Sequence, residues 1–155
     1  MKIAFALLLL VFISGCAAPA YQKPLETQKS AVTSQGQIAP ALDVKVYLVD
    51  LPATVNANSK FVVKWRVDSN QQKDITHTAV HYGSASVGGA LSADVSPANS
   101  GYPSFTPEYA SGNFKIPNEF STAMVLESKG IIFARAHVIV DGKNYWSDEK
   151  SIQVE

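Results

Sequence analysis

The side chains in this chain best suited to bind a metal ion are its three histidines, His77, His81 and His137. His77 and His81 form an H-x-x-x-H pattern within the stretch DITHTAVHYG, whose β-branched residues predict a strand. Residues four apart on a strand are separated by about 13 Å. We therefore expect that both imidazoles cannot reach one ion unless the strand contains a bulge.

Other chemistry has little support in the sequence. The chain has no G-x-S-x-G nucleophile motif, no glycine-rich phosphate loop and no strongly acidic metal loop, and its acidic residues are scattered. We therefore predict that it is not an enzyme. The formal net charge is +0, from 13 basic and 13 acidic residues, and no basic run is present. This balance argues against a nucleic-acid partner.

The single cysteine, Cys16, lies at the end of an N-terminal sequence with the features of a secretion signal. A short positive start, Met1-Lys2, precedes the apolar run 3–13, which is too short to span a bilayer that needs about 20 apolar residues. The run leads into Ile13-Ser14-Gly15-Cys16. This sequence resembles the lipobox of bacterial lipoproteins.

The lipoprotein resemblance implies that residues 1–15 are removed and that Cys16 carries a diacylglycerol, with palmitate-type acyl chains. The protein would then be extracytoplasmic and attached to a membrane through its N-terminal lipid. Ala17 does not match the Asp that favours inner-membrane retention, so the resemblance favours the outer membrane if the source is diderm. The alternative is an ordinary secretory signal cut within Ala17-Ala18-Pro19-Ala20.

The rest of the chain divides into a tether and a folded domain. Residues 16–41 are rich in Ala, Gln, Ser, Thr and Pro and lack a sustained period, which predicts a flexible tether after the lipid. Residues 42–155 contain short alternating stretches separated by turn residues, the best of which is KFVVKWRVD at 60–68. Asp141-Gly142-Lys143 predicts a hairpin turn, and a last strand is expected from Tyr145 to Val154. Six or seven strands without a convincing helix predict an all-β, antiparallel β-sandwich.

Three features of the sandwich region resemble a fibronectin type III domain, within the immunoglobulin-like class. They are Trp65 in the second strand, the long stretch IIFARAHVIVDGKNYWS and the closing SIQVE. The resemblance implies that the strands of His77/His81 and of His137 are neighbours in one sheet. His137 shares a strand face with Arg135, so one cross-strand pair with His77 or His81 is plausible, with Cβ atoms about 5 Å apart.

A metal site of this kind would bind copper or zinc, with a third ligand from Asp74, Asp141 or the long loop that follows. The simpler interpretation is that the histidines are surface or hydrogen-bonding residues and that the protein has no cofactor.

The long stretch 84–118 is rich in Gly, Ser, Pro and Ala and also carries four aromatic residues: Tyr102, Phe105, Tyr109 and Phe114. These rings could cover one end of the sandwich. Alternatively, they form a surface for a protein or glycan partner. The sequence thus predicts a membrane-anchored lipoprotein with one immunoglobulin-like binding or structural module of the cell envelope. The alternative function is an extracytoplasmic copper- or zinc-binding protein.

Overall fold

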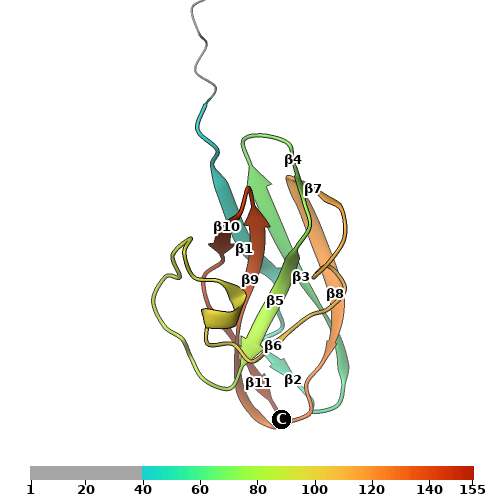
Figure 1. The fold of residues 1–155 in the computed structure, drawn as a ribbon. Helices are drawn as coiled ribbons and strands as arrows, with labels where there is room; N and C mark the ends of the chain where they lie inside the picture. The colour runs from blue at the N-terminus through green and yellow to red at the C-terminus, as the bar shows by residue number, and fades with distance from the viewer. Residues whose placement is uncertain (1–39) are drawn as a thin grey trace, which may run out of the picture. The chain divides into compact units, whose positions relative to one another are not determined.

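The computed structural model describes residues 40–155, which form an all-β domain with one short 3-10 helix (Figure 1). The predicted signal peptide, Cys16 and most of the predicted tether lie outside the described residues. Within residues 40–155, no helix is long and apolar enough to cross a membrane. In chain order the elements are β1 Val44–Asp50, β2 Thr54–Val55, β3 Lys60–Ser69, β4 Lys73–Ile75, β5 Thr78–Gly83, η1 Pro97–Asn99, β6 Ser104–Phe105, β7 Phe114–Ile116, β8 Asn118–Val125, β9 Gly130–Val140, β10 Lys143–Trp146 and β11 Lys150–Val154.

The main strands form two sheets that pack face to face. One sheet has the order β1-β3-β8, and the other has the order β2-β11-β9-β5-β6, with β10 also paired to β9. All of these pairs are antiparallel except β2 with β11, which is parallel. Of the six longest strands that build these sheets, the first, second and fourth (β1, β3 and β8) thus lie opposite the third, fifth and sixth (β5, β9 and β11). This strand order is that of an immunoglobulin-like β-sandwich, and the predicted fold class is confirmed.

The core lies between the two sheets and follows the two-residue alternation of the strands. In β3, Val63, Trp65 and Val67 are fully buried, while the residues between them are more exposed. The indole Nε1 of Trp65 donates a hydrogen bond to Thr78 Oγ1 at 2.8 Å, and that hydroxyl donates to the carbonyl of His137 at 2.7 Å. The core tryptophan is therefore linked across the sandwich to the two strands that carry histidines.

The predicted hairpin joins β9 to β10. Asp141 and Gly142 have φ angles of 49° and 76°, the left-handed backbone that tight hairpin turns require. The last strand, however, is not continuous, because it is interrupted at residues 147–149 and forms β10 and β11. At the break Ser147 replaces a ladder residue: its Oγ accepts from Ala136 N at 2.9 Å, and its N donates to Ala136 O at 2.9 Å.

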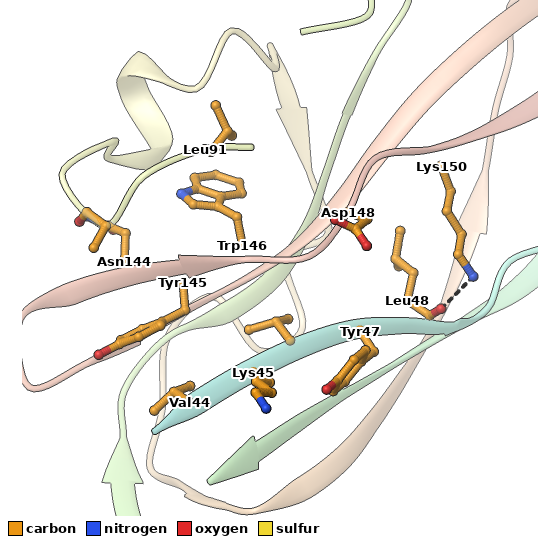
Figure 2. Close-up of a pocket in the computed structure, with 12 residues that line it drawn as sticks. Val44, Lys45, Tyr47, Leu48, Leu91, Asn144, Tyr145, Trp146, Asp148 and Lys150 are labelled. Atoms are coloured by element: carbon orange, nitrogen blue, oxygen red, sulfur yellow. Dashed lines mark hydrogen bonds between the residues drawn. The ribbon is translucent and has the colours of Figure 1, made fainter. Parts of the chain in front are cut away.

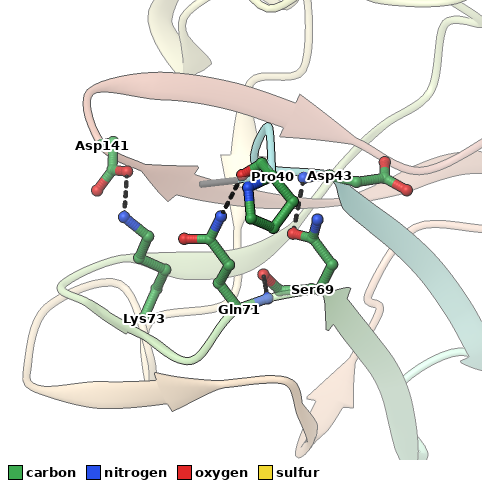
Figure 3. Close-up of polar contacts among 7 residues, drawn as sticks. Pro40, Asp43, Ser69, Gln71, Lys73 and Asp141 are labelled. Carbon is green, nitrogen blue, oxygen red and sulfur yellow. Dashed lines mark hydrogen bonds and ion pairs between the residues drawn. The ribbon is translucent and has the colours of Figure 1, made fainter. Parts of the chain in front are cut away.

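The start of the described chain is hydrogen-bonded to the turn that follows β3, as Figure 3 shows. Asn70 Nδ2 donates to Ala41 O and Gln71 Nε2 donates to Pro40 O, both at 2.8 Å. Pro40 and Ala41, placed in the tether by the sequence analysis, therefore contact the domain. In the same region the ion pair between Lys73 Nζ and Asp141, at 2.7 Å, connects β4 to the β9–β10 turn.

The stretch 84–118 is more ordered than a plain loop, since it contains η1, β6 and β7. Its first part, which includes η1, lies against the outer face of the β9–β5 sheet (Figure 1) and hydrogen-bonds to β9 and β10. As a result, the centre of β9 is buried on both faces: Arg135 is 2% exposed and His137 0% exposed. Of the two alternatives, surface or hydrogen-bonding, the first is wrong for His137, because the face that points away from the core is covered by the chain itself; the second holds, since its ring is hydrogen-bonded to Asn144.

Candidate metal centre

The three histidines converge on one covered face of the β5–β9 pair. His137 lies directly opposite Ala79 in the antiparallel register, and Ala79 is the residue between His77 and His81. Side chains of residues i and i+2 point to the same face of a strand, so all three imidazoles share this face. Since Ala79 has no side chain beyond Cβ, the space above it is left for the rings.

One potential ligand nitrogen from each histidine lies within 4.8 Å of the other two. The expectation that only one of His77 and His81 can join His137 is therefore wrong. The expectation rested on the distance between the backbone positions of His77 and His81. Their side chains approach each other above Ala79, and the two ring centroids are 6.1 Å apart. An ion held at 2.0–2.1 Å by three nitrogens needs them about 3.3–3.6 Å apart. The rings must therefore approach one another by about 1 Å to enclose it.

Neither of the two carboxylates expected as a third ligand lies beside the histidines. Asp74 forms an ion pair with Lys115 at 3.5 Å, and Asp141 pairs with Lys73 at 2.7 Å. Neither carboxylate belongs to the cluster, which within residues 40–155 contains the three histidines alone. The cluster is therefore an all-imidazole donor set, suited to zinc or copper.

Hydrogen bonds orient two of the rings and define which nitrogen is available. His77 Nδ1 lies 2.8 Å from the carbonyl oxygen of Ala110, and a carbonyl can only accept, so Nδ1 carries the proton. His137 Nε2 lies 3.0 Å from Asn144 Oδ1. The amide orientation of Asn144 is fixed because its Nδ2 donates to Ala93 O at 3.1 Å, so the histidine again donates. Such bonds on the far nitrogen are typical of metal-binding histidines.

The opposite nitrogens are left without partners. Among the described residues, His77 Nε2, His81 Nε2 and His137 Nδ1 are buried and have no hydrogen-bond partner. A buried polar atom without a partner normally costs free energy, and native proteins contain few. Each ring thus has one buried nitrogen without a partner, and one nitrogen of each ring lies within 4.8 Å of the other two, which suits a metal ion.

The surroundings keep two of the rings in the neutral form that a metal requires. Burial, with a smaller contribution from His77, lowers the pKa of His81 to about 4. Burial also lowers the pKa of His137 to about 3, against the opposing effect of its hydrogen bond to Asn144. At neutral pH, therefore, no proton has to be displaced from either ring before an ion binds.

Aromatic rings surround the cluster. Trp146 packs on His137 with ring centroids 4.1 Å apart and on His81 at 5.2 Å, and its Nε1 donates to Val95 O at 2.9 Å. Figure 2 shows Trp146 and Asn144 on the side of β10 that faces Leu91, whereas Tyr145 points toward β1, across the groove drawn there. Trp146 and Asn144 thus both support the histidine cluster.

Neither of these supporting residues was predicted from the sequence, although a signal for them exists. A two-residue turn at Asp141-Gly142 sets the register of the hairpin, in which Trp146 lies opposite His137 and Asn144 opposite Ile139. The predicted turn could therefore have placed Trp146 beside the histidine. Ala110, by contrast, lies in irregular chain, and no pattern points to it.

An open pocket gives access to the histidines from solvent. It has a volume of about 490 Å³ and is lined mainly by apolar groups, contributed by His77, His81, Pro97, Ala98, Tyr102, Pro103 and Phe105. Its wall is built by η1 and by the segment that leads to β6. Two rings of the cluster, those of His77 and His81, therefore border the pocket, whereas His137 does not line it.

A second polar network fixes this wall to the sheet. The buried guanidinium of Arg135 donates to Tyr102 OH at 3.0 Å, to Ser147 O at 2.9 Å and to Gly89 O. Tyr102 OH in turn donates to Glu149 at 2.6 Å. Burial, together with the bond to Glu149, raises the pKa of Tyr102 to about 12, so its hydroxyl stays protonated. Arg135 thus connects the covering segment to β9 and to the break after β10.

The four aromatic residues proposed as a partner surface do not form one exposed cluster. Tyr102 is 6% exposed, and Tyr109 and Phe114 pack against the hydrophobic core, where Tyr109 contacts Trp65. Phe105 alone among them is exposed, at 50%, and it lies 5.6 Å from His81 between ring centroids. Three of the four rings therefore cover the sandwich, and the fourth lies at the pocket.

Comparisons with known proteins identify no family for this chain. No family model matches the chain, and no curated protein matches it. Among solved structures, a solution NMR structure of the CARDB domain of PF1109 from Pyrococcus furiosus aligns with 73% of this chain and 93% of that chain. The identity is 10% and the TM-score 0.35. The assignment as an immunoglobulin-like β-sandwich domain rests on the strand order of this chain.

Proposed function

We propose that this chain is a lipid-anchored extracytoplasmic protein of the cell envelope whose immunoglobulin-like domain binds one zinc or copper ion through His77, His81 and His137. The observation that supports this function most directly is the set of three buried, unpartnered imidazole nitrogens. Ligand atoms of the three rings lie within 4.8 Å of one another. The lipid anchor is supported by Ile13-Ser14-Gly15-Cys16 in the sequence.

Binding should stabilise the fold, because the site brings together residues from two strands. An ion present at 1,000 times its dissociation constant stabilises the native state by about 4.1 kcal/mol. For a domain of this size we expect a rise in melting temperature of roughly 12–20 °C. The assay is a thermal melt of the full chain, purified in mild detergent and treated with chelator, with and without zinc or copper. Bound metal is counted in parallel, and one ion per chain is expected.

Variants connect the stabilisation to the cluster. His137→Ala and the double variant H77Q/H81Q should each lose the metal-induced shift. The shift is measured within each variant, so a lower metal-free stability does not affect the result. Asn118→Ala is the control, since Asn118 is exposed on β8 in the other sheet. A shift of wild-type size in H77Q/H81Q would exclude the proposed metal site.

The anchor is tested separately. Wild-type protein should carry a lipid-modified Cys16 as its N-terminal residue by mass spectrometry and should fractionate with membranes. Cys16→Ala should lose both properties while its domain keeps the same response to metal. An unmodified wild-type N-terminus would contradict the lipoprotein assignment without affecting the metal site.

A further inference from the structure

The three histidine ligands of the proposed metal centre would not neutralise the charge of a bound ion. Imidazole binds a metal as a neutral ligand, so three histidines do not neutralise a divalent ion. Within residues 40–155, no carboxylate or thiolate belongs to the ligand cluster. The nearest buried charge in the covering network is the guanidinium of Arg135, which is also positive. Uncompensated charge in a buried site is unfavourable, which favours an anion as an additional ligand.

The carboxylate that is hydrogen-bonded to the covering segment, Glu149, does not supply such an anion. The carboxylate of Glu149 accepts hydrogen bonds from Ser86 Oγ at 2.6 Å, from Val87 N at 2.9 Å and from Tyr102 OH at 2.6 Å. It belongs to the network of Tyr102 and Arg135 and not to the histidine cluster. An additional ligand must therefore come from solvent.

The pocket provides the route for that ligand. His77 and His81 line it, while His137 lies deeper, in contact with Trp146 and Asn144. The remaining lining groups are mainly apolar, and the hydroxyl of Tyr102 is already bonded to Arg135 and Glu149. An ion between the three rings would thus be covered by β5, β9 and Trp146 and would face the pocket on its remaining side. Zinc sites with three protein ligands and one open position have this arrangement.

We propose that the metal centre keeps one coordination position open to the pocket formed by η1 and Phe105 and that small anions from solvent bind there. This inference rests on the proposed function. The lining defines their class. Since apolar walls cannot replace the water shell of a strongly hydrated ion, small, weakly hydrated monodentate anions such as azide and thiocyanate bind here in preference to fluoride or sulfate.

The test uses cobalt(II) in place of zinc, because its visible absorption reports the ligands around the ion. The full chain in detergent is loaded with one equivalent of cobalt and titrated with azide, thiocyanate, fluoride and sulfate. We expect azide and thiocyanate to shift the spectrum in a saturable manner, with one anion per cobalt. Fluoride and sulfate should require at least tenfold higher concentrations.

A matched pair of variants places the anion in the pocket. Ala98 is exposed on η1 and lines the pocket, whereas the adjacent Asn99 is exposed but does not line it. Ala98→Phe should weaken azide binding at least tenfold and leave cobalt binding unchanged, and Asn99→Phe should leave both unchanged. Equal azide binding in the two variants would overturn the proposal that the open position faces this pocket.

Two further outcomes separate the inference from the proposed function. A cobalt spectrum that depends on the histidines but does not respond to any anion would overturn the open position and leave the metal site intact. Failure of cobalt, zinc and copper to bind would instead overturn the proposed function itself.

Discussion

The substitution Asn144→Ala tests whether the histidine cluster is organised to bind metal. Asn144 accepts a hydrogen bond from His137 Nε2 at 3.0 Å and is itself fixed by its bond to Ala93 O at 3.1 Å. Loss of such a bond to the far nitrogen of a ligand typically reduces metal affinity 10–100-fold. The substitution leaves all three candidate ligands in place, so its effect on metal binding reports what the hydrogen bond does for His137: it fixes the orientation and tautomer of the ring and raises its basicity.

The expected magnitude follows from binding linkage. At a zinc concentration 1,000 times the wild-type dissociation constant, the wild-type protein gains about 4.1 kcal/mol. The same concentration is 10–100 times the dissociation constant of Asn144→Ala, which gains about 1.4–2.7 kcal/mol. The variant should therefore lose about 1.4–2.7 kcal/mol of metal-dependent stabilisation. Urea denaturation at fixed free zinc, with and without the metal, measures this difference.

The metal-free comparison separates the two roles of Asn144. Removing one hydrogen bond should reduce the metal-free stability by about 1 kcal/mol, and subtraction of the metal-free curve removes this contribution. Asn118→Ala, on the opposite sheet, should show the full wild-type gain. A zinc-dependent gain in Asn144→Ala within 0.3 kcal/mol of wild type, about the error of such a difference, would refute the reasoning that this hydrogen bond positions a ligand.

Three other predictions concern the β5–β9 pair and the segment that covers it. Because the folded pKa values of His81 and His137, about 4 and 3, lie below the unfolded value near 6.5, the unfolded chain binds more protons in acid. Metal-free stability should thus fall as pH decreases from about 6.5 toward 3, and a flat profile in urea denaturation at several pH values would contradict these shifts. Thr78→Val should leave the buried indole of Trp65 without an acceptor and cost about 1–3 kcal/mol in chemical denaturation, whereas a cost below 0.5 kcal/mol would show that the link is dispensable. Tyr102→Phe removes the hydroxyl that bridges a buried guanidinium and a carboxylate, and it should increase proteolysis of residues 84–103 with little change in the β9 core, measured by limited digestion.

The fold was predictable because its signals are local. The alternation in KFVVKWRVD places Val63, Trp65 and Val67 in the core, and Asp141-Gly142 forms the turn it predicts. The break between β10 and β11 carries no such signal. It depends on Ser147, whose side chain takes the place of backbone in the ladder of β9.

The covering segment could not be predicted, because it is held by contacts between residues far apart in the chain. Arg135 bonds to Gly89 O, 46 residues away, and Trp146 to Val95 O, 51 residues away. The acceptors are backbone carbonyls, which every residue has, so no side-chain pattern identifies them. The alternation in β9 correctly predicts which residues point away from the core. Because the covering segment is not visible in the sequence pattern, the alternation wrongly predicts that these residues are exposed.

The unpartnered nitrogens of the histidine cluster cost free energy, and a purely structural role for the three histidines does not explain why that cost is kept. If they served only to hold segments together, each would need one hydrogen bond, and His77 and His137 already make theirs through Nδ1 and Nε2. Their other nitrogens, with that of His81, would then remain as unpaired polar atoms, each costing about 1–3 kcal/mol. An apolar or amide side chain could support the same contacts at lower cost. A metal ion pairs all three lone pairs at once, so the donor set is better explained by binding than by structure.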